Sequence, residues 1–522
     1  MQDLQVNPEN PQEQNQLFQV EASRQHAFGV PASLSIVGIS TSGQAAARLA
    51  VAVGCSSILI SDSNPHARLK DESLARLKAQ VQLEIGANDN LLHHAELVVL
   101  SPGIPPHSDL VKSLLAKGFT LLSEPDWACL NQPKHARDWI SITGTNGKST
   151  ITSLIAHLLN GVHPQVRSVA CGNIGHAISD VVAESLKQDT PLQIVAELSS
   201  YQLYYSTHLK QKIGVFSNLA PDHLNWHGDW QAYIDAKARL FIGDYASEYA
   251  VLNLDDPIAM QWQNQRNPAK TLGVHTRPHA LEALVVPQLF VNENGVLELY
   301  IATDLQADLA PLLAFNEIQL KRTAYPEAGG HHTQNMLLAI GAVLWDAFIE
   351  NSLPELCEKS SLEKSLSSFQ GLAHRFQRLA VPAPFVVIND SKATNPEAGM
   401  SALRCIPIET PAILLVGGLS KKTPLHDWAK LTQEKTSAVF CFGKDAHDFY
   451  EALEKIGYDK PFSMVENLKD ATRQALTLQQ ADPDTPVLLA PASASQDAFT
   501  DFEDRGRVFE SIVHAFFKEL AV

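Results

Sequence analysis

Residues 139–159, WISITGTNGKSTITSLIAHLL, contain the strongest structural signal in the sequence. This stretch begins with an apolar run typical of a buried strand, WISIT (139–143), and continues into a loop, GTNGKST (144–150). From Ile151 onward apolar residues recur at i, i+3, i+4, i+7 and i+8, which predicts an amphipathic helix. A strand, a glycine-containing loop with Lys148, and then a helix form the local context of a phosphate-binding loop.

The loop departs from the strict phosphate-loop pattern, because Ile142 stands where the first glycine is expected. The structural context still favours phosphate binding over an ordinary strand-to-helix turn. Backbone N–H groups of residues 144–150 can surround a nucleotide phosphate, and Lys148 can neutralise the β and γ oxygens. Ser149 or Thr150 can place a hydroxyl on Mg²⁺.

A second strand, LQIVAE (192–197), ends on an acid. Glu197 can supply the carboxylate that a metal–nucleotide site needs, although a lone glutamate at a strand end is also common on a solvated surface. The segment that follows favours the functional interpretation, because Ser199, Ser200 and Gln202 are unusual at a buried strand edge.

Histidines follow in APDHLNWHGDW (220–230). We expect His223 to contact Mg²⁺ beside a phosphate, whereas His227 is more typical of a hydrogen-bonded surface histidine. Zinc is not favoured, because neither H-E-x-x-H nor a matching Cys/His spacing is present.

The first and last thirds of the chain alternate short apolar runs with helical segments, which predicts parallel sheets covered by helices. Near the N-terminus, GISTSG (38–43) is weaker than a dinucleotide fingerprint, because Ser40 replaces the second glycine, and it could be only a tight turn. In the last third, polar residues follow four predicted strands, at the edge where open α/β sheets bind ligands. Those strands are FVVI (385–388), AILLV (412–416), AVFCF (438–442) and VLLA (487–490). A hairpin is predicted at Asn294-Gly295.

Composition narrows the class of protein. The 522 residues suggest about three domains, and a hydrophobic content of 45% excludes a wholly disordered chain. A formal charge of −17 argues against nucleic-acid binding. Scattered cysteines, no apolar run of about 18 residues and no signal-peptide pattern indicate a cytoplasmic protein without a membrane span. Residues 1–33 are rich in Gln, Asn, Glu and Pro, which indicates a loose extension or, alternatively, a short docked segment.

Several blocks, in this order along the chain, together resemble the Mur ligases. They are GTNGKST (144–150), CGNIG (171–175), ELSSYQL (197–203), DHLNWHG (222–228), AKARLF (236–241), GLAHRF (371–376), NDSKATN (389–395) and SASQDAFTDFEDRG (493–506). The third, seventh and last are typical of the family member that adds D-glutamate. The DNPR-type motif of the member that adds diaminopimelate or lysine is not found. Folylpolyglutamate synthases share the phosphate loop but not these blocks.

The resemblance implies a fold of three α/β domains after the polar extension (1–33). These would be a Rossmann-like UDP-binding domain (34–135), a central P-loop-type ATPase domain (136–372) and a Rossmann-like domain that binds the amino acid (373–522). It implies a monomer that uses ATP and two Mg²⁺ ions to join D-glutamate to UDP-N-acetylmuramoyl-L-alanine through an acyl phosphate. Alternatives are a related ligase for a different amino acid and a regulator that binds UDP-sugars without ligating them.

The resemblance also implies a role for each matching residue. Positions 144–150 (Gly144, Thr145, Asn146, Gly147, Lys148, Ser149 and Thr150) match the ATP loop, with Asn335, Arg375, Asp390 and Lys392 as further ATP-side positions. Ser149, Glu197 and His223 match Mg²⁺ ligands. Lys237 matches a lysine that the family carbamylates to hold the second ion. Without the resemblance, Lys237 would be interpreted as an ordinary solvated lysine on a helix. The positions that match uridine-diphosphate contacts are Ser42, Asp62, Ser63 and the Ser101-Pro102-Gly103 turn. Those that match contacts with the muramoyl group are Asn173, Ser199 and Gln202. Those that match the D-glutamate pocket are Thr394, Lys421, Ser495 and Phe502.

Three positions depart from the family pattern: Ser40 replaces a glycine, His332 replaces an asparagine beside the adenine, and Gln496 replaces an apolar residue of the glutamate pocket. None of them removes a charge that the chemistry requires.

Overall fold

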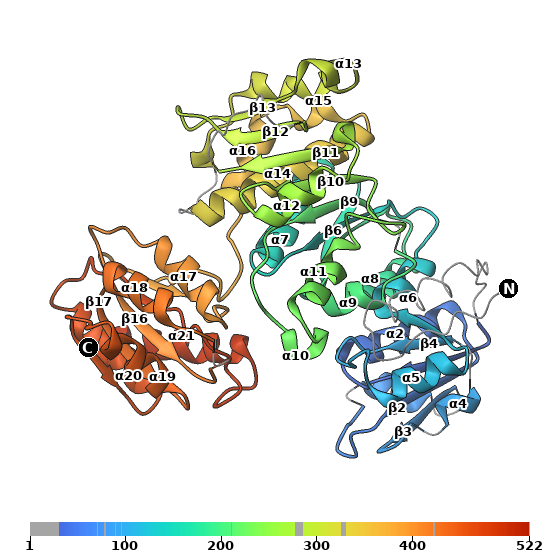
Figure 1. Ribbon diagram of the computed structural model, residues 1–522, viewed down its shortest axis with the longest axis horizontal. Helices are drawn as coiled ribbons and strands as arrows, with labels where there is room; N and C mark the ends of the chain where they lie inside the picture. Colours follow the sequence, from blue (N-terminus) through green and yellow to red (C-terminus); the bar gives the residue numbers. More distant parts are fainter. Residues whose placement is uncertain are drawn as a thin grey trace. The chain divides into compact units, whose positions relative to one another are not determined.

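The computed structural model describes residues 31–520 except 70, 78–79, 89, 95–96, 210, 277–284, 325–329 and 421–422. It is an α/β structure with three sheets (Figure 1). The chain separates into two compact units, which are described one at a time below. The first runs up to Tyr325 and includes Gln334–Phe369, and the second comprises Pro326–Thr333 and Gln370–Val522.

The first sheet is wholly parallel, with the order β3-β2-β1-β4-β5. Its strands are β1 (Ser33–Val37), β2 (Ser57–Asp62), β3 (Val81–Ile85), β4 (Leu97–Leu100) and β5 (Thr120–Ser123). The helices between and after them are α2 (Thr41–Val53), α3 (Glu72–Arg76), α4 (Leu91–His94), α5 (Asp109–Ala116) and α6 (Glu124–Leu130). Because β1 lies between β2 and β4, the chain reverses direction across the sheet beside β1, which is where such folds bind ligands.

The central sheet has the order β13-β12-β11-β10-β9-β6-β8-β7, and only the β12–β13 pair is antiparallel. Its strands are β6 (Trp139–Thr143), β7 (Arg167–Gly172), β8 (Leu192–Glu197), β9 (Gln211–Phe216), β10 (Tyr249–Asn253), β11 (Thr271–His275), β12 (Gln288–Val291) and β13 (Leu297–Tyr300). Its α-helices are α7 (Lys148–Val162), α8 (Ile178–Ser185), α9 (Ser200–Tyr205), α10 (Leu224–His227), α11 (Trp230–Ala238), α12 (Pro257–Gln263), α13 (Gln306–Leu309), α14 (Gly330–Ile349), α15 (Leu353–Leu356) and α16 (Lys359–Ser368). Short 3₁₀ helices are η1 (Pro268–Lys270), η3 (Thr303–Leu305), η4 (Ala310–Ile318) and η5 (Arg322–Ala324).

The two faces of the central sheet are buried by different partners. On one face Ile140 and Ile142 of β6 share a core with α7 and with the apolar helix α14 (Figure 1). On the other face Trp139 and Phe216 belong to a core that continues into α8 and on to α2 and α6 of the first sheet. This continuous core explains why the first two sheets form one compact unit, and the boundary between residues 135 and 136 remains a prediction.

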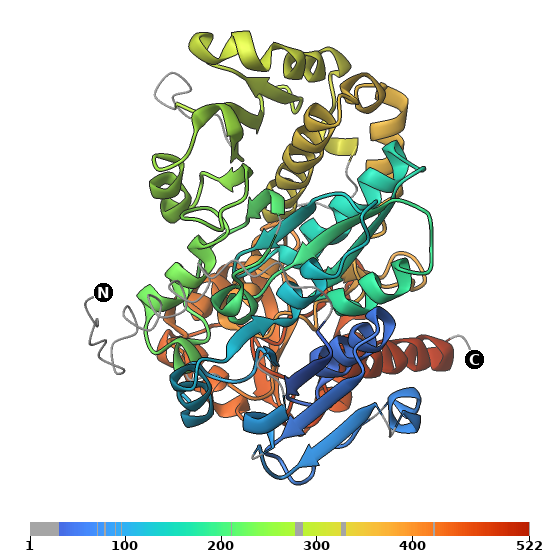
Figure 2. The ribbon, with the colours of Figure 1, turned by 90° about the vertical axis from the view of Figure 1, so that its right-hand side faces the viewer.

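The third sheet, in the second unit, has the order β14-β15-β19-β16-β17-β18, with only the β14–β15 pair antiparallel. Its strands are β14 (Gln377–Arg378), β15 (Val387–Asn389), β16 (Ala412–Gly417), β17 (Thr436–Phe442), β18 (Phe462–Met464) and β19 (Val487–Leu489). Its helices are α17 (Pro396–Arg404), α18 (His426–Lys435), α19 (Ala446–Lys455), α20 (Leu468–Gln479) and α21 (Phe502–Leu520). The last of these is the long red helix that leads to the C-terminus in Figure 2.

The structure confirms the α/β class, the predicted hairpin and the helix that follows the phosphate loop. Gly295 has a φ of +72°, as the tight turn between β12 and β13 requires. The strand predicted over 385–388 is wrong at its start, because the Phe385 N–H bonds to the Pro382 carbonyl in a turn and β15 begins only at Val387. The first strand begins at Ser33, inside the predicted extension, and residues 1–30 lie outside the described part of the chain.

Within the described ranges, no helix is long and apolar enough to cross a lipid bilayer.

Candidate active site

The phosphate loop connects β6 to α7 and is shaped by two glycines. Gly144 has a φ of +145° and Gly147, at the start of α7, has a φ of +83°. Both values disfavour residues that carry a Cβ atom. The loop is fixed from the neighbouring strand tip, because Asn218 accepts hydrogen bonds from the N–H groups of Thr145 at 2.8 Å and Asn146 at 2.9 Å. The backbone is therefore held open at the start of a 15-residue helix, where N–H groups attract anions.

The side chains of the loop point to neighbouring elements. Lys148 Nζ donates to the Thr145 carbonyl at 2.8 Å, and Thr145 Oγ1 lies 2.9 Å from the Tyr233 hydroxyl. Asn335, from α14, packs over the loop, since a Cβ built on Gly147 would lie 2.5 Å from Asn335 Oδ1. The structure thus brings the predicted ATP-side residue Asn335 to the loop.

A buried cluster of oxygen ligands lies beside the loop. The Ser149 hydroxyl donates to Glu197 Oε2, and Asn173 Nδ2 donates to Glu197 Oε1 at 3.0 Å. Glu197 is only 2% exposed, which excludes the solvated-surface interpretation of this acid. A hydroxyl and a carboxylate are hard oxygen ligands of the kind that Mg²⁺ prefers.

The donor set fits Mg²⁺ bound together with a nucleotide. In the described part of the chain no three His, Cys, Asp or Glu side chains gather closely enough to hold a metal by themselves. Protein sites for Mg²⁺ commonly use one or two carboxylates and complete the coordination with water and substrate phosphates. Glu197 and Ser149 can play that part at the edge of the phosphate loop.

Lys237, on α11, is buried beneath the loop. Its side chain is 2% exposed, and Nζ donates to the Gly144 carbonyl at 2.7 Å. Burial, and then the positive charge of Lys148, lowers the pKa of Lys237 well below its usual value. The solvated-lysine interpretation is therefore wrong, because α11 turns this residue inward, against the loop and the Tyr233 ring.

The two histidines differ in exposure. The side chain of His223 is 42% exposed, its backbone has a φ of +56°, and its ring lies 4.8 Å from the Tyr201 ring. His227 is buried, and its Nε2 lies 2.9 Å from the Ser200 hydroxyl. Burial lowers the pKa of His227 to about 3, so this ring is neutral at physiological pH. The expectation of a surface position for His227 is wrong, because aromatic rings of Trp226 and Tyr233 surround it.

Ser199 and Gln202 form a capping box at the start of α9. Ser199 Oγ accepts from the Gln202 N–H at 3.2 Å, and Gln202 Oε1 accepts from the Ser199 N–H at 2.9 Å. This pairing stabilises the helix start that follows Glu197. Contact of these two residues with a muramoyl group remains a prediction.

The predicted uridine-diphosphate residues gather at the carboxyl edge of the first sheet. Asp62, at the end of β2, accepts from the Ile39 N–H at 3.0 Å and so fixes the loop after β1. Ser40 lies 3.3 Å from Ser101 (Oγ to Oγ), which gives the departure at position 40 a partner in the loop after β4. Ser42 lies half-buried in the first turn of α2, and Ser63 is exposed just after β2.

In the second unit, the described site residues lie in the loop before β14, in the loops after β15 and β19, and at the start of α21. Asp390 is half-buried and accepts from the Phe376 N–H at 3.1 Å, and desolvation of its carboxyl raises its pKa to about 6. Lys392 Nζ lies 4.0 Å from the centre of the Phe502 ring. Ser495 is 1% exposed, and its hydroxyl has no hydrogen-bond partner among the described atoms.

The remaining positions of this unit are placed as follows. Arg375 lies between His374 and Phe376, whose φ values are +62° and +49°. The Thr394 N–H bonds to the Lys392 carbonyl at 2.7 Å. Gln496 is exposed and His332 is buried, with its ring 5.6 Å from that of Phe376. Lys421 lies outside the described residues.

The sequence prediction missed Asn218, which fixes the phosphate loop. The signal that could have revealed it is a polar residue just beyond an apolar strand: Asn218 lies two residues after β9 ends at Phe216, at the carboxyl edge of a parallel sheet.

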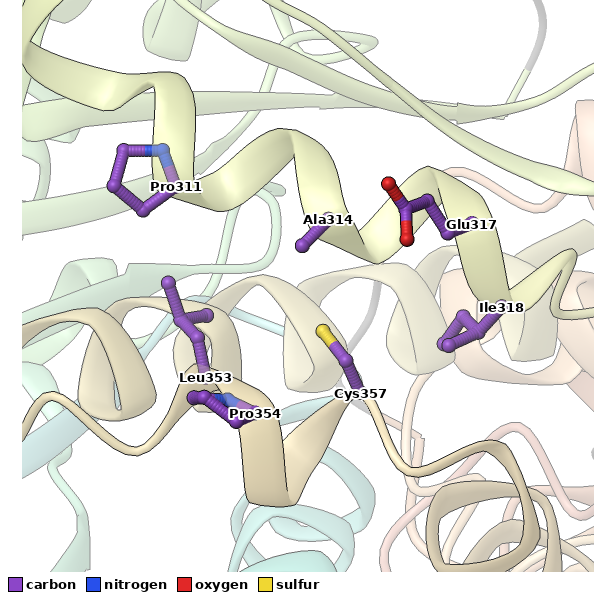
Figure 3. Close-up of a pocket in the computed structure, with 7 residues that line it drawn as sticks. All are labelled: Pro311, Ala314, Glu317, Ile318, Leu353, Pro354 and Cys357. Carbon is purple, nitrogen blue, oxygen red and sulfur yellow. The ribbon is translucent and has the colours of Figure 1, made fainter.

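A separate cavity of about 590 Å³ lies between η4 and α15 (Figure 3). It is lined by Pro311, Ala314, Glu317, Ile318, Leu353, Pro354 and Cys357. None of the predicted site residues is among them, and the one carboxylate, Glu317, would repel a phosphate. The cavity is thus not part of the candidate active site.

The fold and this site define an α/β nucleotide-binding protein with a phosphate loop. The protein-family model described as Mur ligase middle domain matches residues 142–343 of this sequence. A UDP-N-acetylmuramoylalanine–D-glutamate ligase from Desulfitobacterium hafniense is 31% identical over 500 residues, covering 93% of this chain and 98% of the relative. An equally named ligase from Synechococcus sp. is 32% identical, covering 92% and 98%. The chain therefore belongs to the Mur ligase family, which confirms the resemblance seen in the sequence blocks.

Solved structures agree on the fold. A UDP-N-acetylmuramate–alanine ligase from Thermotoga maritima superposes with a TM-score of 0.54 at 16% identity, covering 92% of this chain and 99% of that chain. A pseudomurein peptide ligase type C from Methanothermus fervidus gives a TM-score of 0.53 at 16% identity, covering 93% and 99%. At this identity the likeness establishes the three-domain α/β fold alone.

We predict that Gly147→Ala weakens nucleotide binding about tenfold or more, because the added Cβ must displace Asn335 from the loop. The matched control is Gly118→Ala, at a similar φ of +78° but with no atom within 4 Å of the new Cβ. Both substitutions should cost about 1 kcal/mol of stability from backbone strain. Calorimetric titration with ATP separates the two effects, and equal ATP affinity in both variants would contradict the placement of the nucleotide at this loop.

Proposed function

We propose that this chain is an ATP-dependent ligase that joins D-glutamate to UDP-N-acetylmuramoyl-L-alanine in the synthesis of peptidoglycan precursors. Relatives that carry this activity in their names match over nearly the whole chain. The structural observation that supports it most directly is the buried contact of Ser149 and Asn173 with Glu197 beside the phosphate loop. A loop of this kind with a neighbouring carboxylate suits phosphoryl transfer.

The chemistry explains why ATP is needed to make an amide. A carboxylate is a poor acyl donor, because its leaving group would be oxide. Transfer of the γ-phosphoryl group to the carboxylate of the L-alanyl substrate gives an acyl phosphate with a good leaving group. The amine of D-glutamate then attacks the acyl carbon, and the tetrahedral intermediate expels phosphate. Lys148 and the N–H groups of residues 144–150 would stabilise the charge on the transferred group.

Ser149 and Glu197 would hold a Mg²⁺ ion. His223 is the further protein ligand that we propose for this metal site. When bound, Mg²⁺ would offset negative charge on the phosphates. Asn173, by donating to Glu197 Oε1, holds the carboxylate in its orientation beside Ser149. Asn335, Arg375, Asp390 and Lys392 are the proposed ATP-side residues, and the two loops that carry Thr394 and Ser495, with Phe502, are proposed for D-glutamate.

We propose further that Lys237 reacts with CO₂. Its buried position under Gly144 keeps the amine out of water, and its lowered pKa makes the neutral form more available. The neutral nitrogen would attack the carbon of CO₂ and lose a proton, which leaves a carbamate anion with two oxygens suited to a second Mg²⁺. We place the reaction in the cytoplasm, in keeping with six cysteines that are all free thiols.

Phosphate release in the presence of ATP and UDP-N-acetylmuramoyl-L-alanine tests the proposed function. We expect phosphate release that depends on D-glutamate and that is slower by about 100-fold or more with L-glutamate or D-alanine. D-alanine lacks the side-chain carboxylate and L-glutamate presents it in a different direction, so either substrate would leave buried donors of the pocket unpaired. The Lys148→Ala variant, whose residue faces the loop and not a core, should fold normally and release no phosphate. Equal rates with L-glutamate would point to a ligase of different specificity, and no release with any amino acid would point to a binding protein.

For Lys237 we predict that the alanine variant is nearly inactive and that millimolar formate or acetate restores part of its activity, because a small carboxylate can occupy the place of the carbamate. The matched control is Lys212→Ala, which removes a lysine that pairs with Glu248 at the surface, and it should stay active. Intact-protein mass measured in bicarbonate should show one added CO₂ in the wild type but not in Lys237→Ala. A fully active Lys237→Ala variant would contradict the carbamate.

A further inference from the structure

Arg505, in the first turn of α21, is among the largest side chains that the structure buries completely, with an exposure of 0%. A fully buried guanidinium is rare in proteins unless it is paired with an acid. Among the described residues, no carboxylate is a hydrogen-bond partner of Arg505, and Asp390 and Asp497 act on it through their charges. Burial lowers the pKa of Arg505 to about 10, so the group stays positively charged at neutral pH.

In the described part of the chain, the acceptors of this guanidinium are neutral oxygens in loops or at a strand end. Nε donates to the Ser391 hydroxyl at 3.0 Å, and Nη2 donates to the Ser391 carbonyl at 2.8 Å and the Ser493 carbonyl at 3.1 Å. Nη1 reaches the carbonyls of Ser493 at 3.1 Å, Ala494 at 3.4 Å and Gly417 at 3.5 Å. Ser391 follows β15, Ser493 and Ala494 follow β19, and Gly417 ends β16, and these three strands are neighbours in the sheet.

The oxygens that Arg505 binds belong to the loops that carry the residues proposed for the amino acid. Ser391 lies three residues before Thr394, Ala494 precedes Ser495, and the Ser391 hydroxyl itself donates to the Phe502 carbonyl at 2.9 Å. The loop after β16 joins the same arrangement, because Leu419 and Ala494 exchange two backbone hydrogen bonds of 2.9 and 3.0 Å. The Arg505 side chain is thus hydrogen-bonded to each of the loops that would form the pocket.

We propose that Arg505 is the positioning residue of the amino-acid pocket, whose planar guanidinium sets the spacing between the loops that follow β15, β16 and β19. The inference rests on the proposed function, since the pocket is taken to bind D-glutamate. Arginine suits this task because its five N–H donors lie in one plane with fixed directions, whereas a lysine offers a single point of attachment. Its charge also lies in the unit that must receive an acidic substrate.

The test compares Arg505→Lys with Arg507→Lys, a substitution two residues along the same helix at an arginine with an exposed side chain. We expect Arg505→Lys to raise KM for D-glutamate by about 10- to 100-fold, because hydrogen bonds that align the loops are lost. KM for the UDP-linked substrate should stay within about twofold, because the residues proposed to bind it lie in loops of the first unit. KM for ATP is not a control, since the proposed ATP-side residues Asp390 and Lys392 flank Ser391 in the loop after β15. Arg507→Lys should match the wild type in KM for both D-glutamate and the UDP-linked substrate.

A milder variant keeps the test decisive if Arg505→Lys does not fold, as judged by circular dichroism and thermal unfolding. Ser391→Ala removes only the hydroxyl that links Arg505 Nε to the Phe502 carbonyl, and it should raise KM for D-glutamate by about 3- to 10-fold. An unchanged KM for D-glutamate in Ser391→Ala, or an equal rise of KM for D-glutamate and for the UDP-linked substrate in Arg505→Lys, would overturn the positioning role. Failure of the proposed function is distinguishable, because the wild type itself would then show no phosphate release that depends on D-glutamate.

Discussion

The contact between the Ser149 hydroxyl and the Glu197 carboxylate is the interaction on which the candidate active site depends. A buried carboxylate is costly unless hydrogen-bond donors or a cation compensate it. Here the donors come from the start of α7 and from the tip of β7, so the cluster connects three elements at one sheet edge. Lys237 adds a hydrogen-bond donor beneath the same loop, through the Gly144 carbonyl. The arrangement leaves oxygen ligands and loop N–H groups gathered where a nucleotide phosphate and its metal can bind.

The second unit also compensates a buried charge with hydrogen bonds, but there the buried group is a cation. At the edge of its sheet a buried cation, Arg505, is compensated by carbonyl and hydroxyl oxygens of neighbouring loops. In both units, residues far apart in sequence are fixed to one another by a charged group that water cannot reach. Such networks cost free energy to build and are strongly destabilised when one partner is removed. Their presence at strand ends is consistent with sites that must hold their geometry for chemistry.

Much of the fold could be predicted because its signals are local. The run from Trp139 to Leu159 contains strand, loop and helix in sequence, and the Asn294-Gly295 turn specifies its own hairpin. The site was predictable only where a residue follows a strand or matches a family block, as Glu197 does. The burial of Lys237 and His227 depends on how α10 and α11 pack against other elements, and no local pattern encodes that packing. The common core of the first two sheets likewise arises from α2 meeting α8, a contact between distant segments.

The most direct test of phosphoryl transfer to the substrate carboxylate follows the oxygen atoms of that carboxylate. UDP-N-acetylmuramoyl-L-alanine whose carboxylate carries heavy oxygen is incubated with the wild-type protein, ATP and D-glutamate, and the released phosphate is analysed by mass spectrometry. Activation through an acyl phosphate requires that one carboxylate oxygen leaves with the phosphate, so we predict that each phosphate released carries one heavy oxygen. Phosphate free of the label, in a reaction that still forms the amide, would contradict phosphoryl transfer to the carboxylate at the loop beside Glu197.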